Sequence, residues 1–232
     1  TMTTSEQPKV VFLGAGNMAE ALVRGLINGR VCAAADLAVT DVRPERLQYF
    51  QSAFGVTGLT DNLAAAAMAD VIMLAVKPQQ LREVVAAIAP RLKPAALVIS
   101  IAAGVRCATM ETLLGADARI VRAMPNTPAL VGAGVTAICA GARATAADLD
   151  LAERLLRAVG VVVRVEEPAM DAVTAVSGSG PAYVFYFMEA LLEGARKLGL
   201  PAELARQLVY GTVAGAAKLA EQSPEEPGIL RE

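Results

Sequence analysis

A glycine-rich turn near the start of the chain has the residue types and the spacing to bind a charged ligand. It reads GAGNMA from Gly14 to Ala19 and directly follows the apolar run VVFL. In dinucleotide-binding folds the first glycine permits a tight turn, the second lets the backbone approach a pyrophosphate, and a third small residue lets the helix pack on the strand. The amides and the positive dipole end of the following helix then face the anion. The turn therefore predicts a dinucleotide site, although the same residues could form only a tight turn between a strand and a helix.

Two charged residues after the next apolar run have opposite implications for the cofactor. LAVTDVR places Asp41 22 residues after Ala19, near the position where an acidic side chain holds the ribose hydroxyls of NAD. Arg43 lies two residues further on and could pair with the 2′-phosphate of NADP. Both cofactors stay open on these residues, as does an interpretation in which both side chains are simply solvated.

Small and polar residues follow three further apolar runs. In doubly wound sheets, ligands bind beyond the carboxyl ends of the strands. The candidates there are Ala75, Val76, Lys77 and Pro78 in AVKPQQ, Ala102, Ala103 and Gly104 in SIAAG, and Asn126 and Thr127 in MPNTPAL. SIAAG leaves room for a flat ring. Each stretch could simply end a strand or shape a loop, but together with the glycine turn they favour a binding crevice.

The elements that must position these residues alternate between strand and helix through the first two thirds of the chain. Strands are predicted at Lys9 to Leu13, Leu37 to Asp41, Val71 to Val76, Leu97 to Ile101, Ile120 to Ala123, Val135 to Cys139 and Val161 to Val165. Helices are predicted at Met18 to Asn28, Pro44 to Phe54, Leu63 to Ala69, Gln79 to Ala89, Cys107 to Leu114 and Ala146 to Val159. This alternation predicts an α/β fold with a Rossmann-like, mainly parallel, doubly wound sheet.

The strand pattern stops near residue 167. Three helices are predicted beyond it, at Pro168 to Val176, Pro181 to Leu198 and Pro201 to Glu221, with prolines at first helical turns. We therefore predict a dinucleotide-binding domain at residues 1–167 and an all-α domain at residues 168–232.

The second of these helices carries an unusual apolar run. Residues 182–188 read AYVFYFM, without a polar face for two turns. A helix that is apolar all round must be buried all round, and a short helical tail cannot cover it alone. We therefore expect a homodimer through the C-terminal helices. The preceding SGSGP could bind an anion at the helix start, or form a hinge before a proline-initiated helix.

The composition excludes several classes of function. The chain has 21 Lys and Arg against 23 Asp and Glu, a net charge of −2, so we expect neither nucleic acid nor a membrane as a partner. Histidine is absent, which excludes imidazole bases, His metal ligands and Ser-His-Asp relays. The three cysteines are widely spaced, so we expect neither a metal site nor a disulfide framework. Without a signal-peptide pattern or a membrane-length apolar run, a cytoplasmic protein is expected.

Six motifs together resemble the pyrroline-5-carboxylate reductase family over essentially the whole chain. They are GAGNMAEAL, AVKPQ, SIAAGV, RAMPNTPAL, DAVTAVSGSGPAYVF and AAKLAEQSPEEPGILRE, in that order. The resemblance implies hydride transfer from NADPH, or alternatively NADH, to the C=N carbon of a cyclic imine, which gives L-proline. It also implies an intertwined dimer, which in this family often assembles further into a decamer.

The same resemblance implies roles for particular residues. The pyrophosphate would be held by Gly14, Ala15, Gly16, Asn17 and Met18, the cofactor would be touched by Asn62, and its ribose and nicotinamide would lie against residues 75–78 and 102–104. Substrate-lining candidates are Asn126, Thr127, Thr174 and Ser177. The family's Ser-Pro-Gly-Gly-Thr stretch, whose threonine lies near the imine nitrogen, falls beyond Glu232. We therefore name no catalytic residue. We expect this chain to bind nucleotide better than it reduces imine. Equal turnover by this chain and by one extended through the missing stretch would refute that expectation.

Two other functions remain open on the sequence. A hydroxyacid dehydrogenase of similar build would need a base, commonly a lysine on the first long helix of the second domain, and no lysine lies between Ser177 and Ala195. A nucleotide-binding protein without catalysis would retain both the sheet and the dimer. Turnover of a hydroxyacid would support the first, and cofactor binding that ignores a proline analogue would support the second.

Overall fold

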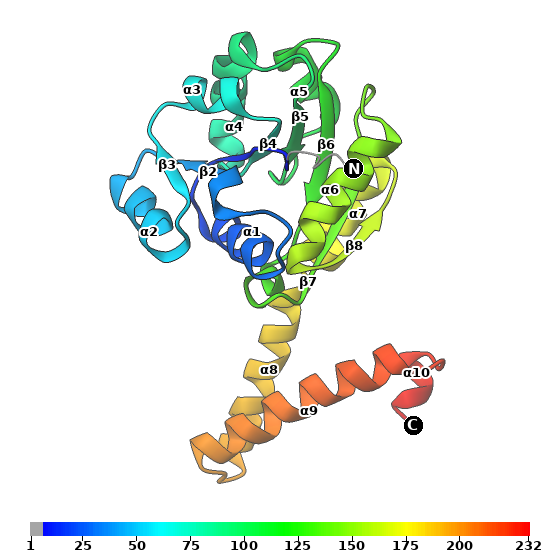
Figure 1. Cartoon of the computed structure of the whole chain (residues 1–232). Helices are drawn as coiled ribbons and strands as arrows, with labels where there is room; N and C mark the ends of the chain where they lie inside the picture. Colours follow the sequence, from blue (N-terminus) through cyan, green and yellow to red (C-terminus); the bar gives the residue numbers. More distant parts are fainter. Residues whose placement is uncertain (1–6) are drawn as a thin grey trace, which may run out of the picture. The chain divides into compact units, whose positions relative to one another are not determined.

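The computed structural model describes residues 7–232, which form an α/β sheet followed by helices (Figure 1). The eight-stranded sheet has the order β3-β2-β1-β4-β5-β6-β7-β8. The strands are β1 (Val10–Leu13), β2 (Leu37–Thr40), β3 (Thr57–Leu59), β4 (Val71–Leu74), β5 (Leu97–Ser100), β6 (Arg119–Met124), β7 (Gly134–Ala140) and β8 (Gly160–Arg164). The first six strands are parallel, β7 pairs antiparallel with β6, and β8 runs parallel to β7. The predicted Rossmann-like, mainly parallel sheet is therefore confirmed.

Helices cover both faces of this sheet. They are α1 (Asn17–Asn28), α2 (Pro44–Phe54), α3 (Asn62–Met68), α4 (Pro78–Ile88), α5 (Cys107–Leu114) and α6 (Ala146–Leu156). Residues of α1, α2 and α6 share one buried apolar cluster with the sheet, and residues of α3, α4 and α5 share the other. Strands β1, β2, β4 and β5 are buried at every position, because a parallel sheet covered on both sides meets solvent on neither.

Two features of the sheet domain differ from the prediction. The strand β3 was not predicted, because three residues with a central glycine carry too little apolar pattern. Short 3₁₀ helices also occur at η1 (Ala34–Asp36), η2 (Ala89–Arg91), η3 (Thr127–Val131) and η4 (Arg157–Val159).

The segment predicted as one helix from Pro168 to Val176 is divided into three helical forms. A 3₁₀ turn η5 (Glu167–Ala169) leads into α7 (Met170–Val173) and then into a π-helix η6 (Thr174–Gly178). The hydroxyl of Thr174 donates to the carbonyl of Met170 at 2.8 Å. Such back-bonding bends a helix, and π-helices are concentrated at functional sites.

The remaining helices are α8 (Gly180–Lys197), α9 (Ala202–Gln222) and the unpredicted short α10 (Pro227–Leu230). Contacts between α-carbons divide the chain into one compact unit up to Gly178 and a second at Ser179–Glu232. A unit defined by contacts need not coincide with a domain defined by its role, so the boundary after residue 167 stays a prediction. Among the described residues, no helix has both the length and the apolarity to cross a membrane.

Candidate nucleotide-binding site

The glycine turn joins β1 to α1 and its two glycines face different surroundings. Gly14 has a φ of +103°, and a Cβ built there would lie 2.7 Å from the carbonyl oxygen of Ala75. Only glycine fits this close approach of β1 to the end of β4. A Cβ on Gly16 would meet no atom within 4 Å, so the backbone at Gly16 is open on the side where a ligand could approach.

The backbone amides of the turn divide into two groups. The amide of Gly14 donates to the carbonyl of Thr40 at 2.9 Å, and that of Ala15 donates to the carboxylate of Asp41 at 3.0 Å. Within residues 7–232, the amides of Gly16 and of the first two residues of α1 have no hydrogen-bond partner. These unpaired donors at a helix N-terminus can bind an anion.

The carboxylate of Asp41 is surrounded by donors. Besides the Ala15 amide, it accepts from the amide of Arg43 at 3.0 Å and from the guanidinium of Arg43 at 2.9 and 3.1 Å. Burial raises the pKa of Asp41, but the hydrogen bonds from Arg43 and Ala15 outweigh burial, so the net pKa is lowered. The same ion pair raises the pKa of Arg43, whose side chain is about half exposed.

A second arginine links the turn to helices α1 and α2. Arg46 of α2 donates to the carbonyl of Ala15 at 2.8 Å and to Glu20 of α1 at 2.9 Å, and Tyr49 donates to the same Glu20 at 3.0 Å. Burial raises the pKa of Glu20, yet the hydrogen bonds from Arg46 and Tyr49 bring it below its usual value. This network fixes the orientation of the turn. It could not be predicted from the sequence, because the residues PERLQY do not show which distant groups their side chains contact.

A cleft of about 370 Å³ opens at this edge of the sheet. It is lined by Gly14, Gly16, Asp41, Val42, Arg43, Thr60, Asn62, Ala75, Val76, Lys77, Gln80 and Val84. Eight of these residues were predicted: seven of them belong to the turn or follow strand ends that meet at one edge of the sheet, and Asn62 was predicted from the family resemblance. Four were missed: Val42, Thr60, Gln80 and Val84. Gln80 and Val84 lie one turn apart on α4, and that spacing was the available signal.

Asn62 is anchored inside the cleft. It is the first residue of α3, and its side-chain oxygen accepts a hydrogen bond of 2.6 Å from the hydroxyl of Thr40. Thr40 is buried at the end of β2. The side-chain amide nitrogen of Asn62 is therefore the end available to a ligand.

The other predicted cofactor residues do not line this cleft directly. Ala15 is fully buried, and Asn17, Met18 and Pro78 are the opening residues of α1 and α4. Ala102, Ala103 and Gly104 follow the carboxyl end of β5, next to β4 in the sheet. They share the edge of the sheet with the cleft.

The predicted substrate-lining residues lie around the end of β6. Asn126 is buried and its oxygen accepts from the amide of Val135 at 2.8 Å, while its side-chain nitrogen donates to the carbonyl of Ser177 at 3.2 Å. Thr127 is exposed at the start of η3, and Thr174 begins the π-helix. The structure thus brings Asn126 and Ser177 into contact across 51 residues of sequence.

Comparison with known proteins identifies both parts of the chain. Residues 167–232 match the family model described as pyrroline-5-carboxylate reductase dimerisation, and residues 9–104 match the model described as NADP oxidoreductase coenzyme F420-dependent. The pyrroline-5-carboxylate reductase of Pseudomonas aeruginosa is 44% identical over 225 residues, which cover 97% of this chain and 82% of that protein.

Solved structures agree with this match. The pyrroline-5-carboxylate reductase of Coxiella burnetii superposes with a TM-score of 0.90 at 41% identity, covering 97% of this chain and 84% of that one. The Plasmodium falciparum pyrroline carboxylate reductase, solved with NADP bound, has a TM-score of 0.88 at 31% identity, covering 97% and 83%. With this identity over nearly its whole length, the chain belongs to the pyrroline-5-carboxylate reductase family.

Proposed function

We propose that the chain reduces the cyclic imine 1-pyrroline-5-carboxylate to L-proline, with NADPH as the hydride donor and NADH as the alternative. The observation that carries this proposal is the open backbone at Gly16 beside the unpaired amides of α1, in a chain of this family.

The residues of the turn fit the diphosphate of such a cofactor. The amides of Gly16, Asn17 and Met18 would donate to its oxygens, where the positive end of the α1 dipole favours negative charge. The amides of Gly14 and Ala15 act differently, because their hydrogen bonds to Thr40 and Asp41 hold the turn in shape. When bound, the reduced nicotinamide supplies the hydride.

The ion pair of Asp41 and Arg43 favours NADPH over NADH. The Asp41 carboxylate already accepts four hydrogen bonds, which leaves it little capacity for ribose hydroxyls. Arg43 neutralises this carboxylate, and its half-exposed guanidinium lines the cleft, where a 2′-phosphate could share it.

On the substrate side, the chain needs to orient the imine more than to protonate it. A protonated imine already carries the positive charge that attracts hydride, so positioning supplies much of the rate. We propose that Ala102, Ala103 and Gly104 border the nicotinamide, and that Thr127, Thr174 and Ser177 line the substrate side. Asn126 would contribute by holding Ser177 in place.

The proposal is tested by following the oxidation of NADPH with purified chain and 1-pyrroline-5-carboxylate. We expect NADPH to be consumed only when both chain and imine are present, with L-proline as the product. Tight NADPH binding without imine reduction would instead support a nucleotide-binding protein without catalysis.

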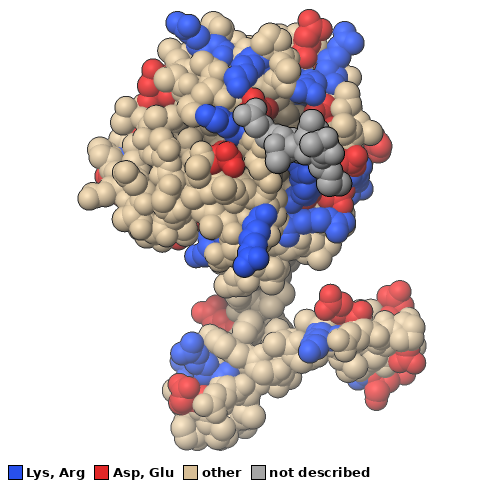
Figure 2. Space-filling model, in the orientation of Figure 1, with Lys and Arg blue, Asp and Glu red and all other residues tan. Residues whose placement is uncertain are grey.

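We also propose that α8 and α9 assemble the protein as a homodimer. Phe185 and Tyr186 of α8 are 62% and 75% exposed, and they line an apolar groove of about 860 Å³ together with Leu192 of α8 and Tyr210 of α9. In Figure 2, most of the visible surface of these two helices carries no charged side chain. Large exposed apolar patches mark protein interfaces, and this region matches the family's dimerisation model.

The proposal also covers assembly beyond the dimer and the residue at which the dimerisation domain begins. A decamer would need contacts between dimers outside the groove on α8. The helical dimerisation domain is proposed to start at residue 168, close to the start of the match at residue 167. Light scattering of the purified protein would distinguish a dimer from a decamer by mass.

A further inference from the structure

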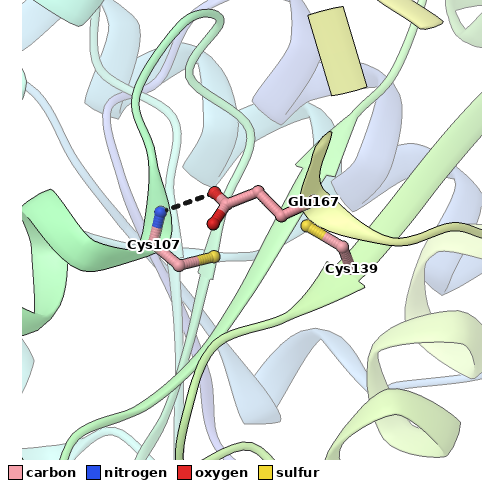
Figure 3. Close-up of side chains that lie close together, drawn as sticks. All are labelled: Cys107, Cys139 and Glu167. Carbon is pink, nitrogen blue, oxygen red and sulfur yellow. Dashed lines mark hydrogen bonds between the residues drawn. The ribbon is translucent and has the colours of Figure 1, made fainter. Parts of the chain in front are cut away.

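Three side chains of metal-binding type gather away from the cleft. Cys107 is the first residue of α5, Cys139 lies on β7, and Glu167 is the first residue of η5. Their two sulfur atoms and a carboxylate oxygen lie within 4.8 Å of one another, and Figure 3 shows the three side chains converging from these separate segments. Both cysteines are 2% exposed.

The cluster has the chemistry and nearly the dimensions of a site for a thiophilic divalent cation. Zn²⁺ binds thiolate sulfur at about 2.3 Å and carboxylate oxygen at about 2.1 Å in a tetrahedron, which sets the ligand atoms roughly 3.5–3.8 Å apart. The three atoms would each need to move by less than about 1 Å to reach this spacing. Glu167 is partly exposed, so a water molecule could reach the fourth position.

Hydrogen bonds already orient the carboxylate for this role. The amide of Cys107 donates to Oε1 of Glu167 at 2.7 Å, and Nη1 of the buried Arg122 lies 3.2 Å from the same oxygen. Oε2 is left for an ion. Ligands held by such outer contacts are typical of metal sites.

The charges also balance. Two thiolates and the Glu167 carboxylate carry −3, Arg122 carries +1, and a divalent cation would bring the sum of these charges to zero. Without the ion, two protonated thiols and the ion pair of Arg122 with Glu167 are neutral as well. Binding therefore exchanges one divalent cation for two thiol protons, which are released to solvent, and leaves no uncompensated buried charge.

We propose that Cys107, Cys139 and Glu167 form a binding site for a thiophilic divalent cation of the Zn²⁺ class. The ion would tie the start of α5 and strand β7 to η5, the turn that leads into α7 and the π-helix. The site is separate from the nucleotide cleft and independent of the proposed reaction.

Titration of the reduced, chelator-treated full chain with Cd²⁺ tests this proposal, because thiolate-to-Cd²⁺ charge transfer gives a new absorption in the ultraviolet, at shorter wavelength than the near-ultraviolet bands of aromatic side chains. We expect the absorption to saturate at one equivalent per chain and to be reversed by Zn²⁺. Cys107→Ser and Cys139→Ser should each weaken Cd²⁺ binding by at least about tenfold, and Glu167→Gln by roughly 10- to 100-fold. Cys32→Ser is the matched control, since Cys32 is also buried but lies outside the cluster, and it should bind Cd²⁺ as the native chain does.

Three results would overturn the proposal. They are the absence of the absorption in the native chain, its persistence at full strength in Cys107→Ser or Cys139→Ser, and its loss in Cys32→Ser. NADPH binding by each variant shows that it is folded, because the cleft and the cluster share no residue.

Discussion

Replacing Gly16 with alanine separates ligand binding from folding at the glycine turn. Gly16 has φ −78° and ψ −177°, which alanine adopts without strain, and the added Cβ meets no protein atom within 4 Å. Alanine gains about 0.4–1 kcal/mol from a less flexible unfolded chain and loses about 0.5–1 kcal/mol as a poorer N-cap than glycine. We therefore expect the free energy of unfolding to change by less than about 0.5 kcal/mol.

Cofactor binding should change much more. The methyl group would occupy the space through which a diphosphate approaches the amides, so at least one hydrogen bond to a charged group is lost, at about 1.5–3 kcal/mol. This corresponds to a roughly 10- to 150-fold increase in the Kd for NADPH. The assay is the change in NADPH fluorescence on titration with the chain, together with urea unfolding of the same sample.

Two further variants make the comparison specific. Gly228→Ala adds a methyl group in equally open space on α10 and should leave the Kd unchanged. Gly14→Ala should instead destabilise the fold, by about 2–5 kcal/mol, because it adds strain at positive φ and overlap with Ala75. A stable Gly16→Ala chain with the native Kd for NADPH would refute the assignment of this turn to the diphosphate.

Replacing Arg43 with alanine should weaken NADPH about tenfold in a fluorescence titration while NADH changes little, because only NADPH carries the 2′-phosphate; equal loss for both cofactors would contradict this. The pKa of Asp41 is lowered in the folded chain, so the ionised carboxylate stabilises the fold at pH values above the ordinary aspartate pKa of about 3.9. This stabilisation is lost as the pH falls through the lowered pKa of the folded state. The difference in urea midpoint between the native chain and Asp41→Asn should accordingly be present at pH 7 and shrink in acid, and a difference that does not vary with pH would count against the ion pair. Phe185→Lys should convert the dimer to monomer in light scattering, since the exposed ring lies in the apolar groove, and an unchanged mass would argue for another interface. Asn126→Ala should cost about 1–3 kcal/mol in urea unfolding, because the amide of Val135 loses its acceptor; an unchanged midpoint would show that Asn126 does not support the loop.

Local sequence patterns were sufficient for most of the fold. Apolar runs of four to six residues separated by helical periods predicted seven of the strands. Four of them, β1, β2, β4 and β5, are buried at every position, because a sheet covered on both faces requires side chains that are apolar on both faces. The edge strand β3 was not predicted because its three residues, TGL, are few and centred on a glycine, whereas β8 at the other edge carries three consecutive valines. The segment from Pro168 to Val176 had a helical pattern, but a helical period does not show the change to a π-helix at Thr174–Gly178, nor the contact of its Ser177 with the distant Asn126.

The cleft could be predicted in outline for a similar reason. Parallel strands place their carboxyl ends at one edge, so residues after separate strands, such as Asp41 and Lys77, were expected to meet there, and both line the cleft. The residue types of Asp41 and Arg43 alone leave the choice between NAD and NADP open. The proposed preference for NADPH rests on the donors that surround the Asp41 carboxylate, and only the folded chain brings the amide of Ala15 to it across 26 residues.

The alternation of most strands and helices in the sheet domain, the glycine turn and the apolar run of α8 follow from the sequence, because each depends on residue types within a few positions of one another. Only the packed structure shows which distant groups meet: Arg46 contacts the carbonyl of Ala15, Asn126 contacts Ser177, and Cys107 lies beside Cys139 and Glu167. Periodicity fixes which face of an element is buried, whereas the partner of a particular polar or sulfur atom is fixed only when the packed elements bring their side chains within a few ångströms.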